Sequence, residues 1–149
     1  RGPMKSKLIG WIGVLVLVIA CVGGCATYSK GPSDAEAVQA LLASWKGVMA
    51  EKNIDKITAM YAENFAHDGY DYQAADKANL RKFIDECNQA GYFDGIEISF
   101  VAAKTDIQGD TATISGIQCD NTQGSVTIGF VAKKGKAGWL FTDMSIQGL

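Results

Sequence analysis

The sequence predicts an α+β domain in which three N-terminal helices pack in a curved, antiparallel, cone-shaped sheet. Between positions 34 and 90, apolar residues recur at steps of three and four, which is the spacing of amphipathic helices. Between positions 96 and 147, stretches rich in Val, Ile, Thr and aromatic residues are separated by turn residues, as in strands joined by hairpins. Helices followed by strands indicate an α+β architecture rather than an alternating α/β one.

Composition limits the size of the fold and the class of partner. The chain has 149 residues, of which 48% are hydrophobic and 20% are charged, enough for one domain and a short extra segment. Residues 25–149 carry a net charge of −5, which argues against nucleic acid as a partner because phosphate binding needs clustered Lys and Arg. The basic cluster Lys133, Lys134 and Lys136 falls at an expected hairpin tip, where charges protect strand ends from pairing.

The N-terminal segment has the organisation of an export signal. Positive residues follow Met4, and positions 8–20 form an uncharged apolar run of the length of a signal-peptide core. A helix that spans a membrane needs about 20 apolar residues. If the run extends to Gly24, a short uncleaved membrane anchor remains the alternative. Residues 1–3 precede the first methionine, and we interpret them as a remnant outside the natural start.

Two cysteines close the apolar run, and the pattern resembles a bacterial lipoprotein signal. The stretch VGGC that ends at Cys25 has an aliphatic residue at −3 and small residues at −2 and −1. The stretch VIAC that ends at Cys21 fits less well, because Ile19 is bulky at −2. The resemblance implies cleavage before Cys25 and a diacylglyceryl group on its sulfur.

This resemblance also implies a domain organisation and a location. Residues 1–24 would be the signal peptide, residues 25–33 the lipidated cysteine and a polar tether, and residues 34–149 the folded domain. The expected location is the bacterial cell envelope, with the membrane as a partner through the lipid anchor. Because Ala26 rather than Asp follows the cysteine, the resemblance implies the periplasmic side of the outer membrane in a Gram-negative host.

The first two helices are expected in the segment that follows the tether. Ser33 and Glu36 have the spacing of a capping box at a helix start. Asn53 ends this helix, and the apolar residues of 54–61 share one face of a second, short helix. The apolar stripe of the first helix is Val38, Leu41, Leu42, Trp45, Val48 and Met49.

A loop and a third helix are expected next. Residues 62–75 show no sustained period and contain Gly69, which indicates a loop. The third helix is expected over 76–90, where Gly91 provides its stop. Its apolar stripe is Leu80, Phe83, Ile84 and Cys87.

Four strands are expected to form an antiparallel meander, because the turns between them are short. The alternation of apolar and polar residues slips after Phe100 and again near Gly116. Such slips indicate β-bulges, which bend a sheet. The expected strands are Ile96–Ile107, Thr111–Asp120, Ser125–Lys134 and Trp139–Gln147.

In the order of its elements the chain resembles the nuclear transport factor 2-like superfamily, including its SnoaL-like and ketosteroid isomerase-like branches. The features that carry the resemblance are Trp45 in the opening helix, KNIDKITAMYAENF (52–65), GDTATISG (109–116) and KKGKAGWLFTDM (133–144). The resemblance implies a cystatin-like cone with a pocket at its open end, which in that superfamily serves isomerases, dehydratases, cyclases and non-catalytic binding domains. It also implies that a homodimer through the sheet is an open alternative.

Two residues are candidates for acid-base catalysis. His67 is the only histidine of the chain and lies in the polar-aromatic stretch FAHDGYDY, and a histidine beside carboxylates can act as an acid or a base near neutral pH. Strand alternation places Asp143 on the same face as Trp139 and Phe141, inside the expected cone. The alternative is that His67 belongs to a solvated loop and that Asp143 is exposed.

Aromatic and sulfur-containing residues are candidates for ligand binding and for a disulfide. Trp45, Tyr61, Phe65 and Tyr70 are the candidates for contact with an apolar ligand, although aromatic residues at helical spacing also serve as core. Cys87 and Cys119 could form a disulfide in an oxidising envelope or remain two separate buried thiols. One histidine and no Cys-x-x-Cys leave too few ligands for a metal site, and no cofactor is expected.

The sequence therefore favours a lipid-anchored envelope domain that binds a small apolar ligand or a partner protein through its pocket or its sheet face. The alternative is an envelope isomerase, dehydratase or cyclase that uses His67 and Asp143 in the pocket. The two hypotheses differ in one geometric requirement, since the enzyme needs both side chains in the same cavity.

Overall fold

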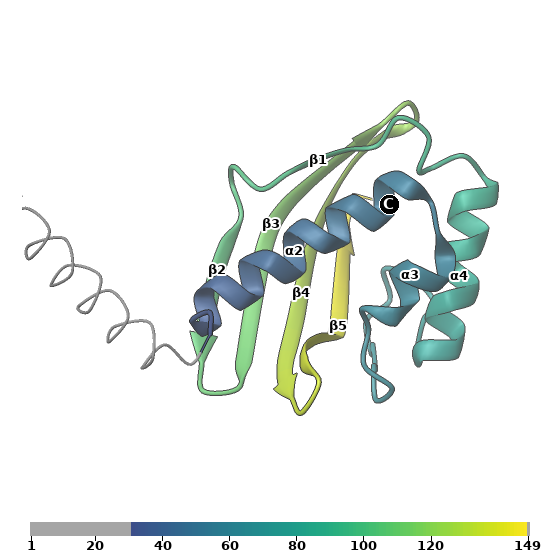
Figure 1. Cartoon of the computed structure of the whole chain (residues 1–149). Helices are drawn as coiled ribbons and strands as arrows, with labels where there is room; N and C mark the ends of the chain where they lie inside the picture. Colours follow the sequence, from purple (N-terminus) through teal and green to yellow (C-terminus); the bar gives the residue numbers. More distant parts are fainter. Residues whose placement is uncertain (1–30, 149) are drawn as a thin grey trace, which may run out of the picture. The chain divides into compact units, whose positions relative to one another are not determined.

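The computed structural model describes residues 31–148, and the part of the chain from Asp34 onward forms one compact unit (Figure 1). The predicted signal peptide (1–24) and the predicted lipidation site Cys25 lie outside the described residues. The elements are α2 (Asp34–Glu51), α3 (Ile54–Ala59), α4 (Lys77–Gln89), β1 (Glu97–Ser99), β2 (Lys104–Gln108), β3 (Thr111–Asn121), β4 (Gly124–Gly135) and β5 (Gly138–Gln147). The predicted α+β class is confirmed.

The helices begin where side chains satisfy their first N–H groups. The Asn53 side chain accepts a hydrogen bond from Lys56 N at 3.1 Å and caps α3. Asp76 accepts from Asn79 N at 2.9 Å and caps α4, one position before the helix itself begins. Such capping stabilises a helix by about 1 kcal/mol.

The sheet has the order β1-β3-β4-β5, with β2 also paired to β3, and every pairing is antiparallel. The single strand predicted over 96–107 is therefore wrong: β1 and β2 pair with successive parts of β3. Opposite the interruption, β3 has a register shift at Gly116, whose φ is +77° and where a Cβ would lie 2.7 Å from Ala102 O. The bulge predicted near Gly116 is thereby confirmed, and it bends the sheet.

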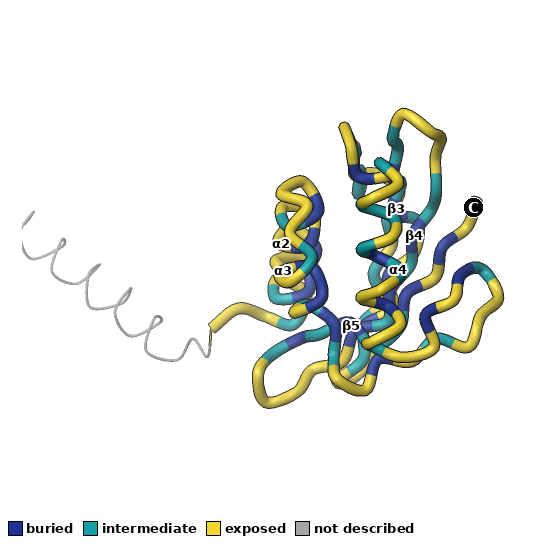
Figure 2. Tube along the Cα trace, turned by 90° about the vertical axis from the view of Figure 1, so that its right-hand side faces the viewer, coloured by how far each residue is buried: buried dark blue, intermediate teal, exposed yellow. Residues whose placement is uncertain are grey.

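The helices cover one face of the curved sheet, and α2 crosses it obliquely (Figure 1). Buried positions of α2 and of the strands face each other (Figure 2). The Trp45 ring meets Phe130 edge-on with centroids 5.0 Å apart, and Phe130 stacks on Phe141 at 3.9 Å. All buried core residues of the described chain fall between positions 38 and 146 of the sequence. We therefore expect the segment from Gly31 onward to fold independently.

The two ends of β4 have different neighbours. At its C-terminal end, Lys134 Nζ donates to Asp34 Oδ1 at 2.9 Å and so joins the β4–β5 turn to the first residue of α2. At its N-terminal end, the turn to β3 is held by Asn121 Nδ2, which donates to Tyr92 O at 2.8 Å. The start of α2 and the α4–β1 loop are therefore attached to opposite ends of the same strand.

Within residues 31–148 no helix combines the length and the apolar character needed to cross a membrane.

Candidate functional site

A cavity of about 400 Å³ lies between the helices and the sheet, and we call it the apolar cavity. Its walls come from α2, α4, β3, β4, β5 and the segments around them. The buried or half-buried residues that line it are Trp45, Met49, Tyr61, Phe83, Ile84, Cys87, Phe93, Ile96, Cys119, Asn121, Val126, Ile128, Met144 and Ile146. Its exposed lining residues are Tyr92, Gln123, Gly124, Ser125 and Gly148, which mark its mouth.

The lining of the apolar cavity contains no Asp, Glu, Lys, Arg or His. Cys87 and Cys119, for which a disulfide was one of two predicted states, are free thiols in this structure, and both line the cavity. Burial raises the pKa of Cys87 to about 11 and that of Cys119 to about 12. Burial also raises the pKa of Tyr61. These three groups are therefore uncharged near neutral pH.

Of the four aromatic residues predicted to contact a ligand, Trp45 and Tyr61 line the apolar cavity. Phe65 is buried beside it and packs edge-on against Tyr61, with centroids 5.5 Å apart. Tyr70 is fully exposed, because it lies on the loop before α4 and points away from the core. Tyr70 therefore lies outside the lining of the apolar cavity, and Phe65 packs against a lining residue without lining the cavity itself.

The two candidate catalytic residues meet each other, with a third residue that the sequence did not single out. His67 Nδ1 lies 2.8 Å from Asp143 Oδ1, and His67 Nε2 lies 2.5 Å from Asp71 Oδ1. The imidazole is 6% exposed and stacks on Tyr72, with centroids 4.3 Å apart. We call His67, Asp71 and Asp143 the histidine clasp. Asp71 could have been noticed because it lies four residues after His67 in HDGYD.

Within the clasp, the histidine and the carboxylates stabilise each other's charged forms. Burial lowers the pKa of His67, but hydrogen bonds to Asp143 and Asp71 outweigh it, so the pKa lies above its usual value. For Asp71, burial opposes but does not cancel the hydrogen bonds from Ile146 N and His67, so its pKa lies below its usual value. Both ring nitrogens of His67 are therefore engaged by carboxylates in this structure.

The segment 60–76, which carries His67 and Asp71 of the clasp, covers the edge of the sheet on the side of β5 away from β4. An exposed edge invites pairing with another chain unless its backbone groups are satisfied. Here the segment 60–76 and the Asp71 and Tyr72 side chains satisfy them. The hydrogen bonds are Phe141 N to Met60 O (3.0 Å), Ala62 N to Phe141 O (2.8 Å), Ala66 N to Thr142 O (3.1 Å), Tyr72 Oη to Met144 O (2.5 Å) and Ile146 N to Asp71 Oδ2 (2.7 Å).

Asp143 does not share the face of Phe141, contrary to the prediction from strand alternation. In the register of β4 and β5, Val131 pairs with Asp143 while Ala132 pairs with Phe141, so that Thr142 is an extra, bulged residue. The bulge reverses which residues face the helices, and Asp143 turns to the outer face. A signal was present in the sequence, since the apolar positions of this strand change from odd (139, 141) to even (144, 146).

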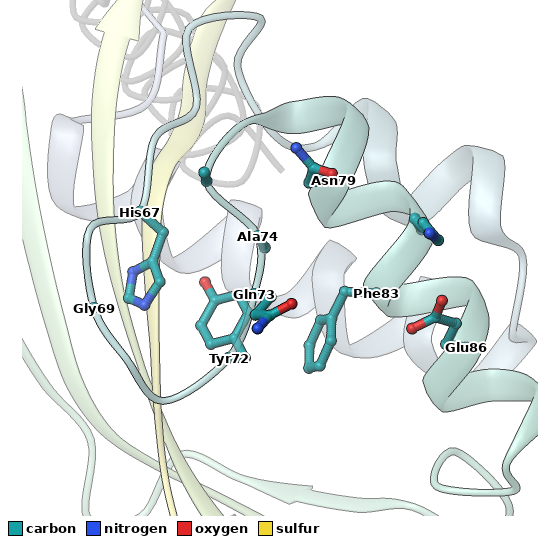
Figure 3. Close-up of a pocket in the computed structure, with 10 residues that line it drawn as sticks. His67, Gly69, Tyr72, Gln73, Ala74, Asn79, Phe83 and Glu86 are labelled. Carbon is teal, nitrogen blue, oxygen red and sulfur yellow. The ribbon is translucent and has the colours of Figure 1, made fainter.

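His67 lines a second hollow, of about 490 Å³, between its own loop and α4. Figure 3 shows His67 and Tyr72 on the loop side of this hollow and Asn79, Phe83 and Glu86 on the α4 side. His67 and Asp143 are both absent from the lining of the apolar cavity. The enzyme hypothesis required both side chains in one cavity, but His67 lines the second hollow and Asp143 lines neither hollow. No set of three or more His, Cys, Asp or Glu residues suited to a metal ion occurs among residues 31–148.

No protein-family model and no curated protein matches this sequence. Solved structures do match. A protein of unknown function with a cystatin-like fold from Nostoc punctiforme aligns with a TM-score of 0.62 and 18% identity, over 75% of this chain and 88% of that one. A nuclear transport factor 2-like protein with a cystatin-like fold from Novosphingobium aromaticivorans aligns with a TM-score of 0.57 and 18% identity, over 76% and 80%. A nuclear transport factor 2-like protein of unknown function from Pseudomonas putida aligns with a TM-score of 0.60 and 14% identity, over 80% and 90%.

At these identities the likeness concerns the fold alone. The domain has the nuclear transport factor 2-like fold.

Proposed function

We propose that the protein is a lipid-anchored domain of the bacterial cell envelope that binds a small apolar ligand in the apolar cavity. The observation that carries the proposal is the cavity itself: about 400 Å³ with apolar, aromatic and sulfur-containing walls and no charged side chain. Small-molecule sites are typically concave, mostly apolar hollows of about 300–1,000 Å³ with a few polar groups.

Binding is favoured over catalysis by the kinds of side chain that line the cavity. Acid-base catalysis needs a group within reach of the substrate whose pKa lies near the working pH. The ionisable groups of the lining are thiols and phenols, and burial raises the pKa of Cys87, Cys119 and Tyr61. An isomerase, dehydratase or cyclase remains the alternative, and it would have to use His67 and Asp143 outside this cavity.

The ligand-binding proposal is tested by native mass spectrometry of the protein purified from its host without apolar additives. We expect a bound small molecule in the wild type and its loss in Cys87→Phe, because the larger ring would fill the cavity from α4. Cys87→Ser is the matched control and should retain the ligand. A wild type without ligand that also fails to bind any added apolar compound would contradict the proposal.

The location is proposed from the sequence VGGC that ends at Cys25. Intact mass spectrometry of the membrane-extracted protein should show a lipid mass increment that Cys25→Ala abolishes and that Cys21→Ala leaves unchanged. Equal membrane retention and equal mass increment in the Cys25→Ala variant would refute lipidation at this residue.

A further inference from the structure

The indole N–H of Trp45 is a buried donor without a hydrogen-bond partner, and it belongs to a residue that lines the apolar cavity. Trp45 is 1% exposed and lines the cavity, and its Nε1 makes no hydrogen bond with any described residue. Buried polar groups in native proteins nearly always have a partner, and each exception calls for an explanation. A ligand atom is one such partner.

The group beside this indole is also weakly satisfied. Tyr61 Oη donates to Met144 Sδ at 3.3 Å, and a thioether is a weak acceptor. Burial raises the pKa of Tyr61, and the nearby Trp45 indole lowers it by a smaller amount. The two side chains are therefore close together, but no hydrogen bond of normal geometry joins them. Trp45, Tyr61 and Met144 all line the apolar cavity. Two weakly satisfied donors therefore belong to neighbouring residues of the lining, whose other polar side chains are Tyr92, Asn121, Gln123 and Ser125.

The lining also excludes a charged ligand group. A carboxylate or an ammonium group buried in the apolar cavity would find no side chain of opposite charge there. Burial of an unpaired charge is strongly unfavourable, whereas a neutral carbonyl needs only a hydrogen-bond donor.

We infer that the ligand is an uncharged, mainly apolar molecule with one hydrogen-bond acceptor, such as a ketone or ester carbonyl. This acceptor takes a hydrogen bond from the indole N–H of Trp45. This inference rests on the proposed function, because it specifies which class of apolar molecule the cavity takes.

The chain contains its own control for the test. Trp139 is the second buried tryptophan whose Nε1 has no hydrogen bond among the described residues, but it does not line the apolar cavity. Trp139→Phe and Trp45→Phe each remove one unsatisfied indole N–H from the core and keep an aromatic ring. They differ in whether the tryptophan that loses its N–H lines the apolar cavity.

The experiment compares three probes with ten carbon atoms each: butyrophenone (a ketone), butylbenzene (a hydrocarbon) and 4-phenylbutyrate (a carboxylate), at pH 8. The protein is the segment from Gly31 onward, labelled with ¹⁵N, in which Trp45 and Trp139 are the two tryptophans. We expect the ketone to bind about tenfold more tightly than the hydrocarbon and more than tenfold more tightly than the carboxylate, since one net hydrogen bond corresponds to about a factor of ten.

In the wild type, the ketone should move the Trp45 indole N–H resonance downfield, the hydrocarbon should not, and the Trp139 resonance should stay in place. Trp45→Phe should abolish the tenfold preference for the ketone and keep the affinity for the hydrocarbon, whereas Trp139→Phe should keep both. The resonance measurement needs no variant, so it decides the matter even if Trp45→Phe does not fold.

The outcomes separate the two proposals. If the hydrocarbon binds as tightly as the ketone, or if the ketone leaves the Trp45 resonance unmoved, the acceptor inference is overturned while apolar binding stands. If the carboxylate binds as tightly as the ketone, the requirement for an uncharged ligand is overturned. If no probe binds and the native protein carries no ligand, the proposed function itself is overturned.

Discussion

Replacement of His67 by Phe tests whether the histidine clasp is a structural lock. Phenylalanine keeps a ring to stack on Tyr72 but removes both hydrogen bonds, so the carboxylates of Asp71 and Asp143 lose the cation between them. We expect the variant to fold and to be less stable, because the segment 60–76 would be held less firmly on the edge of β5.

The magnitude follows from the two contacts. A hydrogen bond to a charged group contributes about 1.5–3 kcal/mol, so the two together set an upper limit of roughly 3–6 kcal/mol. The Asp71 and Asp143 side chains are 25% and 39% exposed, and water can replace part of what each loses. We therefore expect a loss of about 2–3 kcal/mol, which for a domain of this size lowers Tm by roughly 6–15 °C.

The difference between wild type and variant should depend on pH, with a sign fixed by the two shifted groups. The pKa of His67 is raised, so its contribution is fully present below about pH 6.5 and is lost as the pH rises through the folded-state pKa. The pKa of Asp71 is lowered, so its contribution is present above about pH 4 and is lost as the pH falls through its folded-state pKa. The difference should be largest between these limits.

Thermal unfolding followed by circular dichroism at pH 3, 5.5 and 8.5 measures this difference. Tyr70→Ala is the matched control, since Tyr70 belongs to the same loop and is fully exposed. Equal Tm values for His67→Phe and wild type at pH 5.5, or a difference that grows from pH 5.5 to 8.5, would refute the interpretation of the clasp as a lock.

Two further predictions concern the sheet bulge and the buried thiols. Gly116→Ala should lower the free energy of unfolding in urea by about 1–3 kcal/mol, because the φ of Gly116 is +77° and the new Cβ would lie 2.7 Å from Ala102 O. Gly47→Ala, at a helical site with open space, should instead raise this free energy by about 0.5–1 kcal/mol. Equal effects of the two substitutions would contradict the role of the bulge. Cys87 and Cys119 should react with a thiol reagent at pH 8 much more slowly in the folded protein than in the urea-unfolded protein, because burial raises their pKa values to about 11 and about 12. Equal reaction rates in the two states would show that the thiols are accessible in the folded protein.

The helices could be read from the sequence because their signals are local. Asp76 caps α4, and Leu80 and Ile84 are buried at the predicted spacing. The capping residue and the stripe both lie within a few turns of the same segment, and no distant part of the chain is needed to interpret them. Trp45 was likewise found as a cavity residue because the stripe of α2 faces the sheet.

The strands and the histidine clasp were harder to predict because they depend on distant pairing. The predicted strand over 96–107 divides because Gly116, on a different strand, brings its backbone close to Ala102. Asp143 changes face because Thr142 is bulged against β4. The partners of His67 lie 4 and 76 residues away, and only the folded edge of the sheet brings both together.

The position of the first helix residue bears on the direction in which a ligand would travel. Asp34 is tied to Lys134 at one end of β4, while Gly124 and Ser125 at the other end belong to the mouth of the apolar cavity. The twelve residues of β4 separate these ends by roughly 35 Å. With Cys25 lipidated as proposed, the tether would join the domain at Asp34, at the end of β4 that is remote from the mouth. A ligand would then enter the apolar cavity at the end of the domain opposite to the residue where the tether joins it.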